Sequence, residues 1–314
     1  MKENNRSNNI LRFLFLLLLI LLTIVSANAQ FTSTTERTIK GTVYKSLRIK
    51  SRLLGEDLKY SVYLPPEYPD GNKRFPVLYL LHGFDGDETS WIKMGHIQKS
   101  ADSMILHRII RPIIIVMPAG QNSYFINDYK NQFPYEDFFI KEFIPYIDSV
   151  YRTLSEKKFR GIAGLSMGGY GAIILPLKHP DTFGYSIALS AAIRTDATFE
   201  QLSPEKYKIN FSHLYGTSPK SSGRITNHWK ENSPFYLVNE QTAYEYDNIK
   251  WYIDCGIQDF LLPGNEAFHQ LLLKLEIPHE YHMRIGTHNW NYWNMEIPYG
   301  LKFFSSHLPM PEKH

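Results

Sequence analysis

Residues 164–169 read Gly-Leu-Ser-Met-Gly-Gly and match the pattern G-x-S-x-G. Residues 159–163, just before it, are typical of a buried strand, and residues 170–177 are typical of a helix packed on the same core. A strand, this pattern and a helix together predict a sharp turn that exposes the hydroxyl of Ser166 at the carboxyl end of the strand. The glycines two residues before and after the serine leave room for the crossing backbone. The alternative is a glycine-rich turn whose serine has no chemical role.

Two backbone N–H groups are candidate stabilisers of negative charge beside this serine. Met167 begins the predicted helix, so its N–H points to where an oxyanion would form after attack by Ser166. Residues 76–81 form a nearly continuous apolar run, which predicts a strand buried on both faces, and it leads into a His-Gly-Phe-Asp-Gly loop. We expect the N–H of Phe84 in this loop to be the second donor and the ring of His82 to brace the loop. The alternative is an ordinary strand-to-helix turn.

An acid and a base that follow the serine in the chain complete the predicted chemistry. Serine is a weak nucleophile that needs a histidine base, and the histidine needs a carboxylate to orient it. Asp259 lies just past a predicted strand at 250–256, and His288 lies just past a predicted strand at 280–285. The order serine, aspartate, histidine, with each partner on a loop after a later strand, therefore predicts a catalytic triad.

Other acidic and histidine residues compete for these two roles. Asp254 lies inside its predicted strand and not in the loop beyond it, so it is the less favoured acid. His279 and His282 lie before or within a strand, and they lack the i, i+4 histidine spacing of a zinc helix. We expect no metal and no organic cofactor, because a serine, a histidine and a carboxylate need neither.

The predicted strands alternate with predicted helices along most of the chain. Further strands are expected at 42–44, 47–49, 60–64, 113–117 and 186–189, and helices at 97–106, 135–153 (bent at Pro145), 265–275 and from 290 to about 307. This alternation predicts an α/β fold with a mostly parallel central sheet and helices on both faces. Residues 193–248 break the rhythm. We interpret them as an insertion that shapes the substrate pocket, with plain connecting structure as the alternative.

The amino-terminal residues resemble an export signal. Residues 1–29 have a basic start, an apolar run and an Ala-Asn-Ala site that ends at Ala29. We expect cleavage there, a mature domain at 30–314 without a stable membrane anchor, and a periplasmic or secreted location. The alternative is an uncleaved membrane anchor. Cys255 is the single cysteine, so an internal disulfide is excluded.

The charge balance does not indicate a nucleic-acid partner. Residues 1–29 carry three basic side chains and one acidic one, so the net charge of +3 becomes +1 without them. Aromatic residues make up 14% of the chain, which fits either a surface that stacks on sugars and rings or an aromatic core. The oligomeric state is left open.

Four motifs in this order resemble the esterase-D-type branch of the α/β-hydrolases. They are Tyr79–Gly83, Gly164–Gly169, Asp254–Asp259 and Gly286–Trp290. That branch includes feruloyl esterases, acetylxylan esterases, S-formylglutathione hydrolases and mycobacterial mycolyltransferases. The resemblance covers residues 40–307, although residues 193–248 could not be aligned, which leaves the substrate open.

The resemblance implies a role for each motif residue. Ser166 is the expected nucleophile, Asp259 the acid and His288 the base, and the N–H groups of Phe84 and Met167 are the oxyanion donors. The implied function is that of an exported serine carboxylesterase that forms an acyl-enzyme and acts on feruloyl or acetyl esters of plant polysaccharide. Acyl transfer of the mycolyltransferase type is one alternative. A non-catalytic carbohydrate-binding protein on a hydrolase scaffold is another.

Aromatic residues near the motif loops are candidate substrate contacts, because their faces can stack on a sugar or a feruloyl ring. The candidates are His82, Trp91, Tyr124, Tyr170 and Trp290, with Trp293 as a further aromatic residue in the tail after the histidine. For most of them the alternative is packing in the core.

Overall fold

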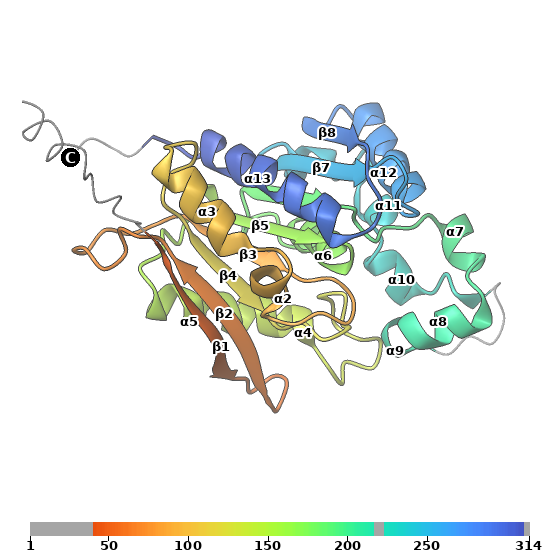
Figure 1. Cartoon of the computed structure of the whole chain (residues 1–314). Helices are drawn as coiled ribbons and strands as arrows, with labels where there is room; N and C mark the ends of the chain where they lie inside the picture. The colour runs from red at the N-terminus through yellow and green to blue at the C-terminus, as the bar shows by residue number, and fades with distance from the viewer. Residues whose placement is uncertain (1–39, 217–222, 311–314) are drawn as a thin grey trace, which may run out of the picture. The chain divides into compact units, whose positions relative to one another are not determined.

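In residues 40–216 and 223–310, which the computed structural model describes, eight strands form one sheet (Figure 1). The strands are β1 (Thr42–Lys50), β2 (Asp57–Leu64), β3 (Val77–Leu81), β4 (Ile114–Pro118), β5 (Arg160–Leu165), β6 (Tyr185–Leu189), β7 (Lys250–Gly256) and β8 (His279–Arg284). Their order across the sheet is β1-β2-β4-β3-β5-β6-β7-β8. The pairs β1–β2 and β2–β4 are antiparallel, and every later pair is parallel. The predicted mostly parallel sheet is confirmed.

Helices cover both faces of this sheet. One face packs against α3 (Ile97–Leu106) and α13 (Trp290–His307), and the other against α6 (Met167–Lys178), α5 (Ile144–Val150) and α12 (Leu262–Lys274). Strand β3 shows why both faces are apolar. Val77, Tyr79 and Leu81 belong to one core, Leu78 and Leu80 belong to the other, and all five are buried. Successive side chains of a strand point to opposite faces, so a continuous apolar run can supply both cores.

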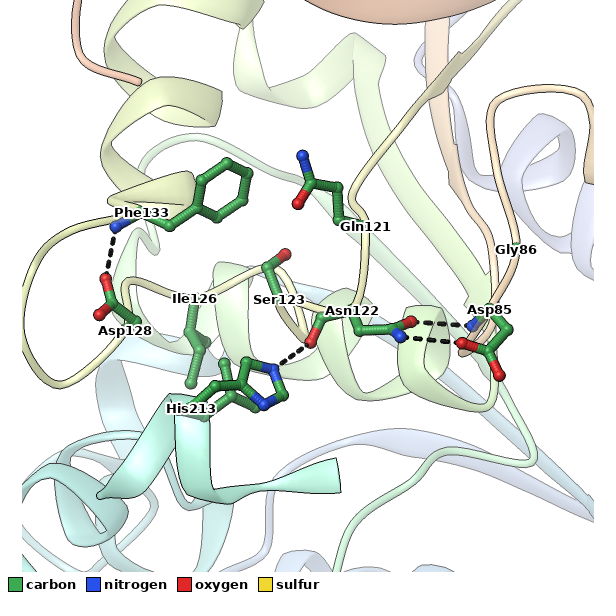
Figure 2. Close-up of a pocket in the computed structure, with 10 residues that line it drawn as sticks. Asp85, Gly86, Gln121, Asn122, Ser123, Ile126, Asp128, Phe133 and His213 are labelled. Atoms are coloured by element: carbon green, nitrogen blue, oxygen red, sulfur yellow. Dashed lines mark hydrogen bonds between the residues drawn. The ribbon is translucent and has the colours of Figure 1, made fainter. Parts of the chain in front are cut away.

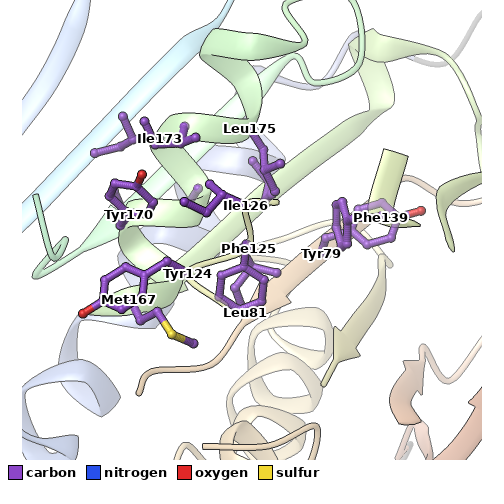
Figure 3. Close-up of a cluster of buried hydrophobic side chains, with 14 of the residues drawn as sticks. Tyr79, Leu81, Tyr124, Phe125, Ile126, Phe139, Met167, Tyr170, Ile173 and Leu175 are labelled. Atoms are coloured by element: carbon purple, nitrogen blue, oxygen red, sulfur yellow. The ribbon is translucent and has the colours of Figure 1, made fainter. Parts of the chain in front are cut away.

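The predicted helix at 135–153 is interrupted in the structure. It consists of α4 (Tyr135–Phe138), a π-helical turn at Phe139–Phe143, and α5, which ends at Val150. Pro145 lies in the first turn of α5, where its missing N–H is tolerated, and the wider π turn precedes it. The apolar face stays in the core, where Phe139 packs against Tyr79 with ring centroids 5.4 Å apart (Figure 3).

Residues 193–248 form a group of short helices. They include α7 (Asp196–Glu200), α8 (Pro204–Asn210), α9 (Ser212–Tyr215), α10 (Asn227–Glu231), α11 (Pro234–Leu237) and a 3-10 turn at Ala243–Tyr246. Figure 1 shows α7 to α10 gathered at one end of the sheet. An aromatic cluster holds them together, with Phe199 stacked on Trp229 at 3.7 Å between ring centroids and edge-on against Phe211 and Tyr215. The segment therefore has a small core of its own.

The amino-terminal expectations concern residues that the structure does not describe. The predicted signal peptide at 1–29 and its cleavage site at Ala29 both lie outside the described residues. Within the described residues, we find no helix with the length and apolar character needed to cross a membrane.

Candidate active site

Ser166 lies in a strained turn between β5 and α6. Its φ of 53° and ψ of −115° are a conformation that side-chain-bearing residues rarely adopt. Hydrogen bonds hold it there: its N–H donates to the carbonyl of Leu189, and its own carbonyl accepts from the N–H of Ala192. A methyl group on Gly164 would lie 2.4 Å from the carbonyl carbon of Gly168, and one on Gly168 would lie 2.5 Å from a carbonyl oxygen at the end of β3. Both positions therefore require glycine.

The structure brings the three predicted triad residues together. Nε2 of His288 lies 2.9 Å from Oγ of Ser166, and Nδ1 of His288 lies 2.8 Å from Oδ2 of Asp259. Because a carboxylate only accepts, the Nδ1–H of His288 donates to Asp259, and Nε2 is left to accept from the serine hydroxyl. Asp259 follows β7 and His288 follows β8, so both loops reach the carboxyl edge of the parallel sheet where the turn after β5 lies.

The carboxyl group of Asp259 is suited to hold an imidazolium. Burial raises its pKa, but hydrogen bonds from His288 and from the N–H of Leu261 outweigh burial, and the pKa lies below its ordinary value. Asp259 is therefore ionised at neutral pH and can stabilise positive charge on His288.

The competing acid is engaged elsewhere. Asp254 lies inside β7, as expected, and its carboxylate accepts from Arg284 Nη1 at 2.7 Å and from the hydroxyl of Tyr292 at 2.6 Å. Of the competing histidines, His279 has another partner: its Nε2 lies 2.7 Å from Nδ1 of His269.

Both expected oxyanion donors are available. Met167 is the first residue of α6, so its N–H has no acceptor in a preceding helical turn. Phe84 lies on the wall of the cavity that contains Ser166, and its N–H makes no hydrogen bond within residues 40–216 and 223–310.

His82 braces the loop that carries Phe84. Its Nδ1–H donates to the carbonyl of Gly83 at 2.7 Å, and its Nε2 accepts from the N–H of Gly120 at 2.8 Å. Burial lowers the pKa of His82, so the ring is neutral. The assignment of His82 as a substrate contact was wrong, because the ring is enclosed and both nitrogens are occupied.

A cavity of about 790 Å³ opens over Ser166 and His288. Of the aromatic candidates, Tyr124, Trp290 and Trp293 lie on its wall. The ring of His288 lies between Trp293 and Phe260, with centroid distances of 4.9 and 4.7 Å. The sequence analysis did not predict that Phe260 lines the site, although a residue directly after the expected acid Asp259 could have been expected to lie near His288.

Two aromatic assignments are corrected. Trp91 is 1% exposed, and its indole N–H donates to the carbonyl of Leu81, so it supports Trp290 from behind, edge-on at 5.3 Å. Tyr170 is buried beside Tyr124 (Figure 3), and its hydroxyl donates to the carbonyl of Asn232. Neither ring lies on the cavity wall, because each is packed in a core.

Part of the segment 193–248 forms one wall of the cavity. The lining residues from it are Ile193, Arg194, Thr198, Leu202, Lys206 and Asn210. The sequence reasoning named none of them, because the segment has no periodic pattern that would show which side chains point inward.

A second cavity of about 480 Å³ adjoins the first and shares Asp85 and Gly86 with it. Figure 2 shows how Asn122 holds the loop at this point. Its amide Nδ2–H donates to the Asp85 carboxylate at 2.9 Å, and the N–H of Asp85 donates back to Asn122 Oδ1 at 2.8 Å. His213 from α9 contacts the carbonyl of Asn122 at 2.9 Å. The loop that carries Phe84 is thus connected to the segment 193–248.

Acidic, histidine and cysteine side chains do not gather into a metal-binding group of three or more anywhere in the described ranges.

Comparisons with known proteins identify the family of the chain. The model of the Esterase family, described as "Putative esterase", matches residues 51–304. An acetyl esterase from Caldicellulosiruptor saccharolyticus is 26% identical over 266 residues, which cover 81% of this chain and 95% of that protein. An endo-1,4-beta-xylanase/feruloyl esterase from Xylanibacter ruminicola is 39% identical over 136 residues, 40% of this chain and 18% of that protein. A solved ferulic acid esterase has a TM-score of 0.73 at 29% identity, covering 86% of this chain and 99% of that chain. The chain therefore belongs to this esterase family and has the α/β-hydrolase fold.

Proposed function

We propose that the protein is an exported serine carboxylesterase that hydrolyses acetyl or feruloyl esters through an acyl-enzyme. The observation that carries the proposal is the continuous hydrogen-bonded line from Asp259 through His288 to Ser166, which ends at a cavity. This arrangement has a nucleophile, a base and an orienting acid in contact, as acyl transfer to serine requires.

The reaction proceeds in two halves. Oγ of Ser166 attacks the ester carbonyl carbon while His288 Nε2 takes the serine proton, and the N–H groups of Phe84 and Met167 stabilise the oxyanion. The carbon–oxygen bond to the alcohol then breaks, and His288 gives its proton to the leaving alcohol. Water repeats the sequence on the acyl-enzyme: His288 takes a proton from water, the acid is released, and Ser166 regains its proton. Asp259 stays ionised and holds the imidazolium in place.

The substrate proposal rests on the relatives and on the cavity wall. The relatives named above are an acetyl esterase and feruloyl or ferulic acid esterases. The cavity has aromatic side chains at Tyr124, Phe260 and Trp290 against which a planar acyl group can pack. The leaving alcohol in this proposal is a sugar hydroxyl of a plant polysaccharide. Export is proposed from residues 1–29, whose basic start, apolar run and Ala-Asn-Ala site are typical of a signal peptide.

The test is hydrolysis of 4-nitrophenyl acetate and methyl ferulate by the wild type and by Ser166→Ala. We expect the substitution to lower kcat by about 10³-fold or more, because losing the nucleophile of such a triad costs up to about 10⁶-fold. Ser149→Ala, which changes an exposed serine on α5, is the matched control and should keep full activity. A folded Ser166→Ala protein with undiminished hydrolysis would contradict the mechanism.

Two further measurements separate the other two functions. Mass spectrometry of the products distinguishes a released free acid from an acyl group transferred to an added alcohol. If a fluorophosphonate fails to label Ser166 in the folded wild type, the binding-protein alternative is favoured.

A further inference from the structure

Arg194 is a half-buried cation on the wall of the catalytic cavity. Its guanidinium lies over the ring of Phe211, 5.1 Å from the centroid, and its Nη1–H donates to the carbonyl of Ala192 at 3.3 Å. Within the described parts of the chain, it forms no ion pair with a carboxylate. Arginines withdrawn from water are usually paired with an anion, and no carboxylate of the described residues fills that role here, so this position favours a bound anion.

The acidic residues closest to Arg194 in the chain and in the cavity are occupied by other donors. Asp196 accepts from the indole N–H of Trp229 at 2.8 Å and from the hydroxyl of Tyr236. Asp85, which also lines the cavity, accepts from Asn122. Neither carboxylate is directed to the guanidinium, which leaves it available to a ligand.

Aromatic packing holds Arg194 in position. Phe211, beneath the guanidinium, packs against Tyr124 with ring centroids 5.3 Å apart, and Tyr124 lies on the cavity wall. A guanidinium fixed on a ring loses little freedom when it binds, and its planar N–H groups match the two oxygens of a carboxylate.

A second cation lies on the same wall. Lys206 is an exposed residue of α8 that lines the cavity, and in the described residues its ammonium has no carboxylate partner. Thr198 and Asn210 add a hydroxyl and an amide to this wall. The wall that the segment 193–210 contributes thus carries two cations and two polar groups beside the apolar Ile193 and Leu202.

We infer that Arg194, assisted by Lys206, forms a subsite for a carboxylate group carried by the ester substrate. The inference rests on the proposed esterase function and names the substrate class further: an ester with a negative charge away from the reacting carbonyl. That carboxylate belongs either to the acyl part, as in a dicarboxylic half-ester, or to the alcohol part, as in an acetylated uronic acid.

The experiment uses two pairs of esters that differ in this charge. For the acyl side, 4-nitrophenyl hemisuccinate is compared with 4-nitrophenyl pentanoate. For the alcohol side, 4-carboxyphenyl acetate is compared with its methyl ester, 4-(methoxycarbonyl)phenyl acetate. The readout is the ratio of kcat/KM for the charged ester to kcat/KM for the neutral ester. Comparing this ratio between variants cancels the intrinsic reactivity of each ester.

We expect Arg194→Met to lower the ratio by about 10- to 100-fold for one of the two pairs, which is the size of a hydrogen bond to a charged group. Arg194→Lys keeps the charge but loses the planar pair of N–H groups and the stacking on Phe211, so it should retain only part of the ratio. Lys206→Gln should lower it by about two- to fivefold, since an exposed charge contributes less. Lys208→Gln is the matched control: it removes the same charge from the same helix at an exposed position that does not line the cavity, and the ratio should stay unchanged.

The outcomes separate this inference from the function on which it rests. If the Arg194→Met ratio equals the wild-type ratio for both pairs, the subsite is refuted while the esterase stands. If Arg194→Met does not fold, two other measurements decide the question. The first is the kcat/KM ratio of Lys206→Gln. The second is the kcat/KM ratio of the wild type at increasing salt, which must decrease if the preference is electrostatic, because salt screens charges. If Ser166→Ala still hydrolyses the neutral esters, both the proposed function and the subsite fail.

Discussion

The hydrogen bonds of His82 favour the neutral form of its ring in the folded protein. Its Nδ1–H is donated to the carbonyl of Gly83, and its Nε2 accepts from the N–H of Gly120. Protonation of Nε2 would remove the lone pair that accepts from the N–H of Gly120, and this N–H would then face a positively charged ring. Burial adds to this cost and lowers the pKa of His82 below its ordinary value of 6.5.

We expect the free energy of unfolding to fall as the pH drops below about 6.5, because there the unfolded chain binds a proton at His82 more readily than the folded chain, in which the pKa is lowered. His82→Asn should make this dependence less steep, by up to about 1.4 kcal/mol per pH unit. Urea unfolding at pH 7, 6 and 5 measures it. His96→Asn is the control: His96 is exposed, and its positive φ of 46° suits asparagine. Equal slopes in the two variants would refute the assignment.

The turn between β5 and α6 depends on how closely the elements approach one another. Helix α6 is buried on nearly every side, and its first turn lies against the ends of β3 and β5. Gly164 and Gly168 allow this approach, which places Ser166 between strand and helix with its hydroxyl toward His288. The position of Ser166 is therefore a property of three packed elements.

Gly164→Ala should both destabilise the protein and lower its activity. The added methyl group would meet the backbone of Gly168 at 2.4 Å, and backbone cannot move aside as a flexible side chain can. We expect a loss of about 1–3 kcal/mol in unfolding free energy, as for other overpacked sites, together with a lower kcat/KM for 4-nitrophenyl acetate. Thermal unfolding and the ester assay measure the two effects.

Gly71→Asn is the control for this substitution. Gly71 has a φ of 67°, which asparagine tolerates, and nothing lies within 4 Å of the added carbon, so stability and activity should be retained. A Gly164→Ala protein that matches the wild type in both measurements would show that the contact is relieved at no cost.

On the scale of the whole molecule, the sheet encloses the single thiol and assembles the triad. Cys255 lies in β7 between β6 and β8 and is buried, and burial raises the pKa of its thiol. A reagent reaches it only when the sheet opens. The loops that carry Ser166, Asp259 and His288 follow three different strands of the same sheet, so these side chains meet only when β5, β7 and β8 are all in place.

We expect the protein isolated from outside the cytoplasm to begin at Gln30 and to carry one unreactive thiol. Intact mass measured after treatment with a thiol reagent should show no adduct on the native protein and one adduct after denaturation, because only the unfolded chain exposes Cys255. A mass that includes residues 1–29 would contradict the predicted cleavage. A native protein that is labelled at once would contradict the burial of Cys255.

The family, the layers of the fold and the identity of the three triad candidates could be derived from the chain alone. These features depend on short-range patterns: apolar runs such as residues 76–81 predict buried strands, and the loops that carry Asp259 and His288 directly follow predicted strands. Parallel strands bring their carboxyl ends to one edge, so residues far apart in the chain could be expected to meet.

Which way each aromatic ring points was decided only by the packing of distant segments. Trp91 and Trp290 look equally suitable in the sequence, yet one lies behind the other, because the space beside Leu81 accepts one indole and the cavity borders the second. That Arg194 forms no ion pair with a carboxylate of the described residues could not be predicted from the sequence either, because it depends on where each acidic side chain is directed in the fold. Local patterns are set by neighbours in the chain, whereas burial and pairing are set by contacts between residues that the fold brings together.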